Sequence, residues 1–201
     1  MRVAGITDSD GLLDLAKSLG SPIPSLSGKL VKRLTVVPAA AGKARTLSAV
    51  HGTGEFPLHT DTAFWPVPAR YLVFRAEGDI RRRTVVCTFD HLFARCGSTQ
   101  DLMEMSLWVV RTPQASFYSA MRFREGTHVG WRYDGNCMCP ANRAACEFQR
   151  LWEQAVASDE PDEISWDNNS AIVISNWIAL HGRGPQPQDE RERILERVYV
   201  R

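Results

Sequence analysis

The stretch Phe56-Pro57-Leu58-His59-Thr60-Asp61 decides how the rest of this chain is interpreted. His59 and Asp61 stand two residues apart, and residues at that spacing on an extended strand point to the same face of a sheet. A second imidazole, that of His181, follows far downstream in Ala179-Leu180-His181-Gly182-Arg183. Two histidines and one carboxylate form a facial triad that holds iron(II) and leaves coordination positions open. We therefore expect His59, Asp61 and His181 to meet in the folded protein.

The segments around this stretch predict a mainly β protein with flanking helices. Apolar residues recur at helical spacing at 8–19 and 142–157, and the shorter segments 90–94 and 101–105 also favour helix. Alternating or β-branched residues predict strands at 31–37, 69–76, 83–88, 106–111, 116–124, 131–133, 170–178 and 193–200. Many short strands without a βαβ rhythm indicate a β-sandwich or jelly roll. We expect residues 1–201 to form a single domain around one core.

Composition and charge narrow the classes of function. Apolar residues make up 44% and charged residues 23% of the chain, as in ordinary soluble domains. A formal net charge of +1 gives no electrostatic reason to expect nucleic acid or an anionic membrane as a partner. The compact basic run Arg81-Arg82-Arg83 is typical of a solvated turn. No apolar run reaches the roughly 18 residues of a membrane span, and the first residues lack a hydrophobic signal core, so we expect a cytoplasmic protein.

The five cysteines are odd in number and irregularly spaced, which predicts reduced thiols in a cytoplasmic chain. Cys137, Cys139 and Cys146 are close in sequence, as zinc ligands often are, but a fourth ligand at the usual spacing is missing. The sequence therefore favours ordinary thiols over a zinc site there.

Beyond the spacing of its histidines, the chain resembles the iron(II)/2-oxoglutarate-dependent dioxygenases of the TauD/TfdA superfamily. The resemblance is strongest to the clavaminate synthase-like branch, which includes asparagine and arginine hydroxylases. It runs from about Thr46 to Arg201 and is most specific in three segments, Phe56–Ala63, Pro68–Ala76 and Ala179–Val200. It implies a double-stranded β-helix, which is a cupin-like jelly roll. It also implies that His59, Asp61 and His181 bind the iron.

The resemblance extends to the co-substrate. In the family an R-x-x-x-R pattern near the C-terminus binds 2-oxoglutarate, and Arg193 and Arg197 match its two positions. A guanidinium offers a planar fork of donors that fits a carboxylate. The family also supplies a threonine from the strand after the HxD strand, for which Thr84 is the expected residue and Thr88 the competing one. The alternative is that the arginines alternate with acidic residues on a solvated edge strand.

Residues for the substrate are suggested by Trp131-Arg132-Tyr133-Asp134, which resembles a segment that runs near the substrate in the amino-acid-hydroxylating branch. Arg132 and Asp134 would share one face of a strand and grip an ammonium or carboxylate, or they would form a surface pair. Ser48 and Phe64 lie close enough in sequence to the metal motif to line the pocket. The chain is short for the superfamily, which implies an open site or a lid formed by a second subunit of a homo-oligomer.

Taken together, these features predict an oxygenase that uses iron(II), 2-oxoglutarate and O2. It would hydroxylate, desaturate or cyclise an unactivated carbon of a small amino-acid-like or natural-product substrate. Asp61 is a carboxylate, whereas the related halogenases have a small residue there, so halogenation is not expected. One alternative is a catalytically inactive metal-binding jelly roll that acts as a partner subunit. Another is a hydrolase or isomerase in a cupin-like barrel, against which Arg193 argues, because such a site needs no carboxylate clamp.

Overall fold

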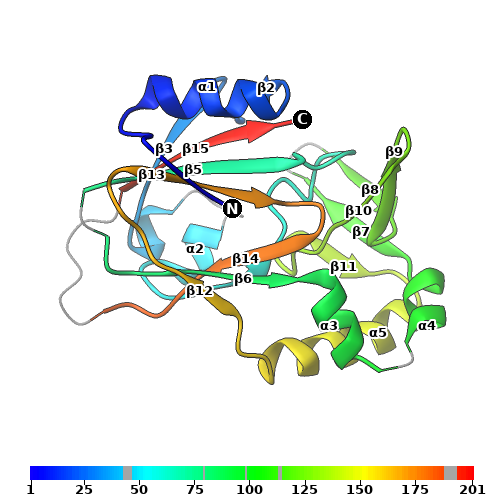
Figure 1. Cartoon of the computed structure of the whole chain (residues 1–201). Helices are drawn as coiled ribbons and strands as arrows, with labels where there is room; N and C mark the ends of the chain where they lie inside the picture. The colour runs from blue at the N-terminus through cyan, green and yellow to red at the C-terminus, as the bar shows by residue number, and fades with distance from the viewer. Residues whose placement is uncertain (43–46, 79, 98, 113–114, 188–193) are drawn as a thin grey trace.

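Two antiparallel sheets form the centre of the molecule (Figure 1). The computed structural model describes residues 1–42, 47–78, 80–97, 99–112, 115–187 and 194–201. The first sheet has the strand order β1 (Arg2–Ala4), β13 (Ser170–Ser175), β5 (Tyr71–Glu77), β15 (Ile194–Val200) and β2 (Pro22–Ile23), with β3 (Val31–Thr35) also paired to β15. The second has the order β12 (Asp162–Ile164), β6 (Thr84–Thr88), β14 (Ala179–Arg183) and β4 (Phe56–His59). Arg193 lies outside the described residues.

The sheets and helices stack in four layers, which are seen from top to bottom in Figure 1 as α1 (Ser9–Leu19), the first sheet, the second sheet, and α3 (Phe89–Arg95) with α5 (Arg143–Ala157). Each layer boundary is a separate apolar cluster. Leu12 and Ala16 of α1 pack on the outer face of the first sheet. Phe148 and Trp152 of α5 pack beneath the second sheet. The third cluster fills the space between the inner faces of the two sheets.

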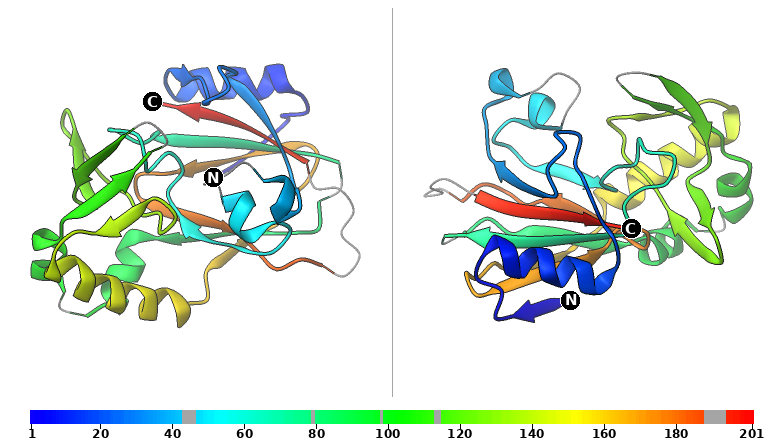
Figure 2. Two further views of the ribbon diagram at one scale, coloured as in Figure 1. Left: turned by 180° about the vertical axis from the view of Figure 1, so that it is seen from behind. Right: turned by 90° about the horizontal axis from the view of Figure 1, so that it is seen from above.

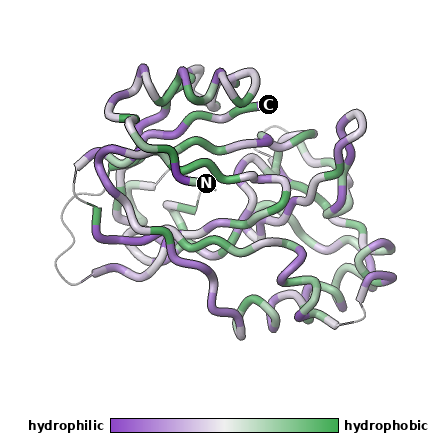
Figure 3. The backbone as a smooth tube through the Cα atoms, in the orientation of Figure 1, coloured by the Kyte–Doolittle hydropathy of each residue, from purple (hydrophilic) through white to green (hydrophobic). Residues whose placement is uncertain are grey.

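Alternation along the strands produces these layers. Successive side chains of a strand point to opposite faces, so Phe74 of β5 contributes to the cluster between the sheets, whereas its neighbour Val73 packs under α1. In β14, Leu180 likewise faces the α3–α5 layer and Ala179 faces the first sheet. Hydrophobic stretches accordingly run through the central strands in Figure 3. The arrangement is a sheet-rich antiparallel fold consistent with the predicted jelly roll.

The two long helices begin where the sequence indicates. The carboxylate of Asp8 accepts from the backbone of Gly11 at 2.8 Å and caps α1. The amide oxygen of Asn142 accepts from the backbone of Ala145 at 2.9 Å and caps α5. Each cap satisfies an amide that the first helical turn leaves without an intrahelical partner. No helix among the described residues is long and apolar enough to cross a membrane.

The remaining elements form two smaller sheets and several short helices. They are β7 (Trp108–Arg111), β8 (Ser116–Ser119), β9 (Arg122–Glu125), β10 (His128–Trp131), β11 (Met138–Pro140), η1 (Ala39–Ala41), α2 (Leu47–His51) and α4 (Gln100–Met105). One small sheet has the order β11-β7-β8, and the other pairs β10 with β9. Seen from behind, η1 and α2 lie in front of the strands of the two main sheets (Figure 2).

Two of the predicted strands differ from the structure. The strand expected at 116–124 is divided into β8 and β9, which pair with different partners, and the buried side chain of Met121 stands between them. The strand expected at 170–178 ends at Ser175, where Asn176 begins the turn into β14. Pairing with neighbouring strands sets the ends of these strands, and the alternation of residues in the sequence does not reveal which strands pair. The other predicted strands and helices are present within a few residues of the expected bounds.

Gly182 is needed where β4 and β14 approach each other. A β-carbon built on Gly182 would lie 2.6 Å from the backbone oxygen of Phe56 and 3.0 Å from Val85, which is closer than such atoms pack. The register between β14 and β4 shifts at this point, between His181 and Arg183. A Gly182→Ala variant is therefore expected to be destabilised by about 1–3 kcal/mol, because β4 must move away. Urea unfolding would measure the effect. Gly135→Ala is the control, since its added carbon would meet nothing closer than 3.5 Å.

Candidate metal centre and co-substrate site

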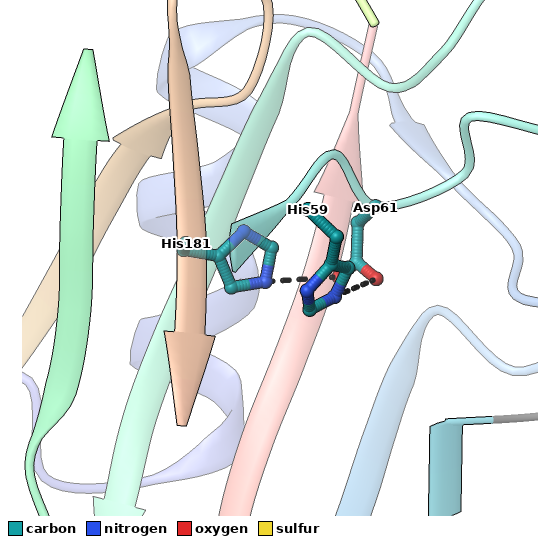
Figure 4. Close-up of side chains that lie close together, drawn as sticks. All are labelled: His59, Asp61 and His181. Carbon is teal, nitrogen blue, oxygen red and sulfur yellow. Dashed lines mark ion pairs between the residues drawn. The ribbon is translucent and has the colours of Figure 1, made fainter. Parts of the chain in front are cut away.

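His59, Asp61 and His181 do meet, at the rim between the two main sheets (Figure 4). His59 ends β4, His181 is its paired residue on β14, and Asp61 follows in the turn after β4. Nε2 of His59 lies 3.7 Å from Oδ1 of Asp61, and Nε2 of His181 lies 3.8 Å from Oδ2. Two ligand atoms about 2.1 Å from one ion and at right angles to each other are about 3 Å apart. A small contraction of the triad would therefore fit an octahedral iron(II).

Backbone contacts hold the first two triad residues in place. Nδ1 of His59 lies 2.9 Å from the carbonyl oxygen of Pro57. Because a carbonyl oxygen only accepts, Nδ1 carries a proton, and in the neutral imidazole the lone pair is on Nε2, the nitrogen nearer to Asp61. The buried amide side chain of Asn176 accepts from the backbone of Asp61 and donates back to its carbonyl, both at 2.9 Å. Sequence reasoning did not identify Asn176, because an asparagine in a turn carries no distinctive pattern.

The turn after Asp61 is held in an unusual conformation. Thr62 has a φ of 57°, which is rare for a β-branched residue and costs conformational energy. Its hydroxyl accepts from the backbone of Ala69 at 2.8 Å, which ties the turn to the start of β5. Thr60, between the two ligands, points away from them and exchanges two hydrogen bonds with the backbone of Tyr133. These contacts fix the direction of the Asp61 carboxylate.

Arg197 of β15 faces the same carboxylate from the first sheet. One terminal nitrogen lies 2.5 Å from Oδ2 of Asp61, the guanidinium lies over the Tyr199 ring at 4.3 Å, and Nε has no partner among the described residues. Burial alone would raise the pKa of Asp61, but the charge of Arg197, the hydrogen bond with His59 and the charge of His181 together hold it well below its usual range. The carboxylate is therefore ionised, as a metal ligand must be.

His59 has the opposite shift. Burial alone would lower the pKa of its imidazole, but the hydrogen bond to Asp61 and the charge of Asp61 outweigh burial and raise the pKa above its usual value of 6.5. A protonated imidazole has no lone pair for a metal. We therefore expect iron(II) binding to weaken as the pH falls through the pKa of His59, by about tenfold per pH unit below it. Anaerobic titrations with iron(II) between pH 6 and pH 8 would measure this, and a flat profile would contradict it.

The two candidate threonines lie in different surroundings. Thr84 is buried at the start of β6 and shares a strand face with Val86, the residue paired with His181. Thr88 is exposed, and its hydroxyl accepts from the backbone of His91 at 3.3 Å, which caps α3. Thr88 therefore has a structural role.

The guanidinium of Arg132 is hydrogen-bonded to the backbone of the same chain. Its terminal nitrogens donate to the carbonyl oxygens of Ala63, Trp65 and Pro66 at 2.7–3.2 Å, and its residue surface is only 2% exposed. These contacts favour a role in holding the loop after the triad over the expected substrate contact. Asp134 differs, since it is buried, accepts from the backbone of Asn136 at 2.8 Å, and its charge acts on His59.

A cavity of about 390 Å³ lies next to the triad strand, between α2 and α5. Its wall includes Pro57 and Leu58 of β4, His51 of α2, Tyr133 and Trp152. Ser48, Phe64, Arg132 and Asp134 are not among its lining residues, although neighbours of Ser48 and Asp134 in the sequence are. Both Ser48 and Phe64 are half-buried.

Two buried arginines clamp the loop that precedes β4. Arg183 donates to the carbonyl oxygens of Gly52 and Gly54 at 2.5–2.8 Å and lies over the Phe56 ring, with 3.7 Å to its centroid. Arg82 is fully buried and donates to the carbonyl of Thr53 at 2.8 Å. The expectation of a solvated turn at Arg81-Arg82-Arg83 is therefore wrong for Arg82. Both clamps help to place the strand that carries His59.

Comparison with models of protein families found no match, and comparison with curated proteins found none either. Solved structures do match. An asparagine oxygenase in complex with Fe(II), 2S,3S-3-hydroxyasparagine and succinate has a TM-score of 0.75 at 18% identity, over 94% of this chain and 63% of its own. The non-heme iron oxygenase OrfP in complex with Fe and alpha-ketoglutaric acid has a TM-score of 0.69 at 21% identity, over 94% and 63%. The PvcB protein from Pseudomonas aeruginosa has a TM-score of 0.69 at 16% identity, over 98% and 72%.

These similarities show that the chain has the fold of non-heme iron oxygenases. The chain spans about 63% of the length of the first two structures.

Proposed function

We propose that this chain is an iron(II)- and 2-oxoglutarate-dependent oxygenase, built as one double-stranded β-helix domain over residues 1–201. His59, Asp61 and His181 would bind the iron. The observation that carries the proposal is the triad of two buried histidines and a largely buried aspartate, which faces the largely buried Arg197, on a fold shared with oxygenases of this chemistry. Bound iron would supply the activation of O2 that oxidises an unactivated carbon.

Charge balance around the triad supports a dianionic co-substrate. Asp61 and Arg197 neutralise each other across 2.5 Å. Iron(II) at the triad would then add two positive charges without a further anion in contact, and a buried uncompensated charge is costly. The two carboxylates of 2-oxoglutarate offset these charges. Arg197, with its Nε still unpaired among the described residues, would donate to one of them.

The remaining residues of the site would hold the metal ligands and the co-substrate in place and would not take part in the reaction itself. Thr84 would donate its hydroxyl to a carboxylate of 2-oxoglutarate, and Arg193, which matches the first position of the R-x-x-x-R pattern, would bind the same co-substrate through its guanidinium. Asn176 and the turn at Thr62 hold Asp61 so that its oxygens face the two imidazoles. The layers of apolar side chains on both sides of the second sheet keep water from the ligands.

The substrate we propose is a small, amino-acid-like molecule. Asp134 offers a buried carboxylate close enough to influence His59, and it would attract an ammonium group. The similar structures contain 3-hydroxyasparagine in one protein and (3S)-hydroxy-L-Arg in the other, which supports hydroxylation of this class of compound.

Anaerobic titration of the iron(II)-loaded protein with 2-oxoglutarate would test the proposal. A weak visible charge-transfer band should appear as the keto acid chelates the metal, and exposure to O2 should then release succinate. A band without succinate, across a panel of amino acids, would indicate the inactive metal-binding jelly roll instead. No band in protein that demonstrably holds iron would exclude 2-oxoglutarate from the site.

A further inference from the structure

A second group of metal-ligating side chains lies on the outer face of the second sheet. Cys87 belongs to β6 but points to the α3–α5 layer, away from the triad. His91 is in the first half of α3, and Asp159 follows the end of α5. Their ligand atoms all lie within 4.8 Å of one another. Figure 1 shows α3 beside α5 at this corner of the molecule.

The carboxylate of Asp159 is at the centre of the group. Its Oδ2 accepts from Sγ of Cys87 at 3.2 Å, and its Oδ1 lies 2.7 Å from Nε2 of His91. The Asp159 side chain is only 3% exposed, whereas that of His91 is 54% exposed. A cation could therefore enter from solvent beside the exposed imidazole of His91 and reach the two less exposed ligands, Cys87 and Asp159.

The thiol is unsuited to act as a nucleophile. A reactive cysteine needs cationic neighbours that favour the thiolate. Burial and the adjacent Asp159 instead raise the pKa of Cys87 to about 12. A cation that replaces the thiol proton would remove this conflict, because the metal favours the thiolate and neutralises the carboxylate at once.

A structural role, in which the group anchors α3 to the end of α5, explains the presence of His91 and Asp159 but not that of Cys87. His91 and Arg95 already bind Asp159, and Arg95 also donates to the carbonyl of Ser158 at 2.7 Å. That anchor has no need of a thiol, which is a weak donor. The charge of Asp162 also acts on Cys87. A second carboxylate is therefore close to the group.

We propose that Cys87, His91 and Asp159 bind a thiophilic divalent ion of the zinc class. Zinc bonds of 2.0–2.3 Å place tetrahedral ligand atoms about 3.3–3.6 Å apart. Nε2 of His91, now 2.7 Å from Oδ1 of Asp159, would therefore move outward by about 0.6 Å, which its exposure permits. The Cys87 proton would leave to solvent, and water would fill the fourth position. Magnesium and calcium are excluded by their preference for oxygen ligands. The ion would join β6, α3 and the segment after α5.

Cobalt(II) is the probe that separates this site from the triad. Cobalt bound to a thiolate has an intense near-ultraviolet charge-transfer band, and the triad contains no sulfur. The 201-residue protein should gain the band with one equivalent of bound cobalt, and zinc should abolish it. Cys87→Ser should eliminate the band, whereas Cys146→Ser, which removes an exposed thiol elsewhere, should leave it unchanged. A missing band, or one that persists in Cys87→Ser, would overturn the proposal.

Two further variants replace exposed side chains, so that their effect on metal binding can be measured without disturbing the folded protein. His91→Ala removes an exposed side chain and should weaken zinc binding by about 10-fold or more. Arg95→Gln removes the nearby positive charge and should strengthen binding by about 3- to 10-fold. A group that serves only as an anchor would show neither change.

The double variant His59→Ala/His181→Ala lacks the triad and should still gain the thiolate band. Zinc at 100 times its Kd should raise its Tm by about 5–10 °C. If the 2-oxoglutarate titration fails while this band remains, only the proposed function is lost. If the band alone is missing, only the second site is lost.

Discussion

A His59→Ala variant should bind iron(II) about 100-fold more weakly than the unaltered protein, since the loss of one ligand costs at least as much as the loss of a supporting contact. His59 provides one of three ligand groups, and its Nε2 is held toward Asp61 by the contact of Nδ1 with Pro57. At iron concentrations that saturate the unaltered protein, the chelate band with 2-oxoglutarate should disappear. Anaerobic titration followed in the visible range would measure both effects.

The matched control for this variant is His128→Ala. His128 is exposed on β10 and takes no part in the triad, so its removal should leave iron affinity and the chelate band unchanged. Circular dichroism should show both variants folded, because the small side-chain loss at His59 removes no strand pairing. Full iron binding by His59→Ala would contradict the assignment of the triad, whatever the activity of the protein.

Much of the fold follows from the sequence because periodicity is a local property. The apolar stripes of α1 and α5, with their Asp8 and Asn142 caps, specify those helices directly. The layer order does not follow from periodicity, since nothing in the alternation of β13 or β15 indicates which strand it will pair with. The division of the segment 116–124 shows the same limit, because β8 and β9 join different sheets.

The site was predictable as far as side-chain type implies chemistry. The candidate triad of His59, Asp61 and His181 could be predicted because two imidazoles and a carboxylate suit iron(II) and because the surrounding segments resemble those of iron(II) oxygenases. Asn176 and Arg82 could not, because they act through hydrogen bonds to backbone groups that only the fold brings near them. The hydrogen bonds of Arg132 could not be predicted either, since this residue, expected near the substrate, donates to three carbonyl oxygens that only the fold brings near it.

An Arg197→Leu variant should be destabilised by about 3–5 kcal/mol in the metal-free protein, because Asp61 would remain as a buried carboxylate without its cation. The charge of Arg197 is the first contribution that lowers the pKa of Asp61 against burial. With the folded pKa below the unfolded one, the pair contributes stability above the unfolded pKa of about 3.9 and loses it as the pH falls through the folded value. Urea unfolding at pH 7 would measure the loss.

Iron(II) should reverse most of this destabilisation, and that reversal distinguishes a site from a structural ion pair. Metal at the triad gives Asp61 a new cation, so the variant should gain more stability from iron(II) than the unaltered protein does. Its 2-oxoglutarate affinity should nevertheless fall, since the guanidinium is no longer present to bind a carboxylate. Arg33→Leu is the control, because its ion pair with Glu77 is exposed and should cost under about 1 kcal/mol with or without iron. Equal destabilisation of Arg197→Leu in both states would mean that iron does not bind at Asp61.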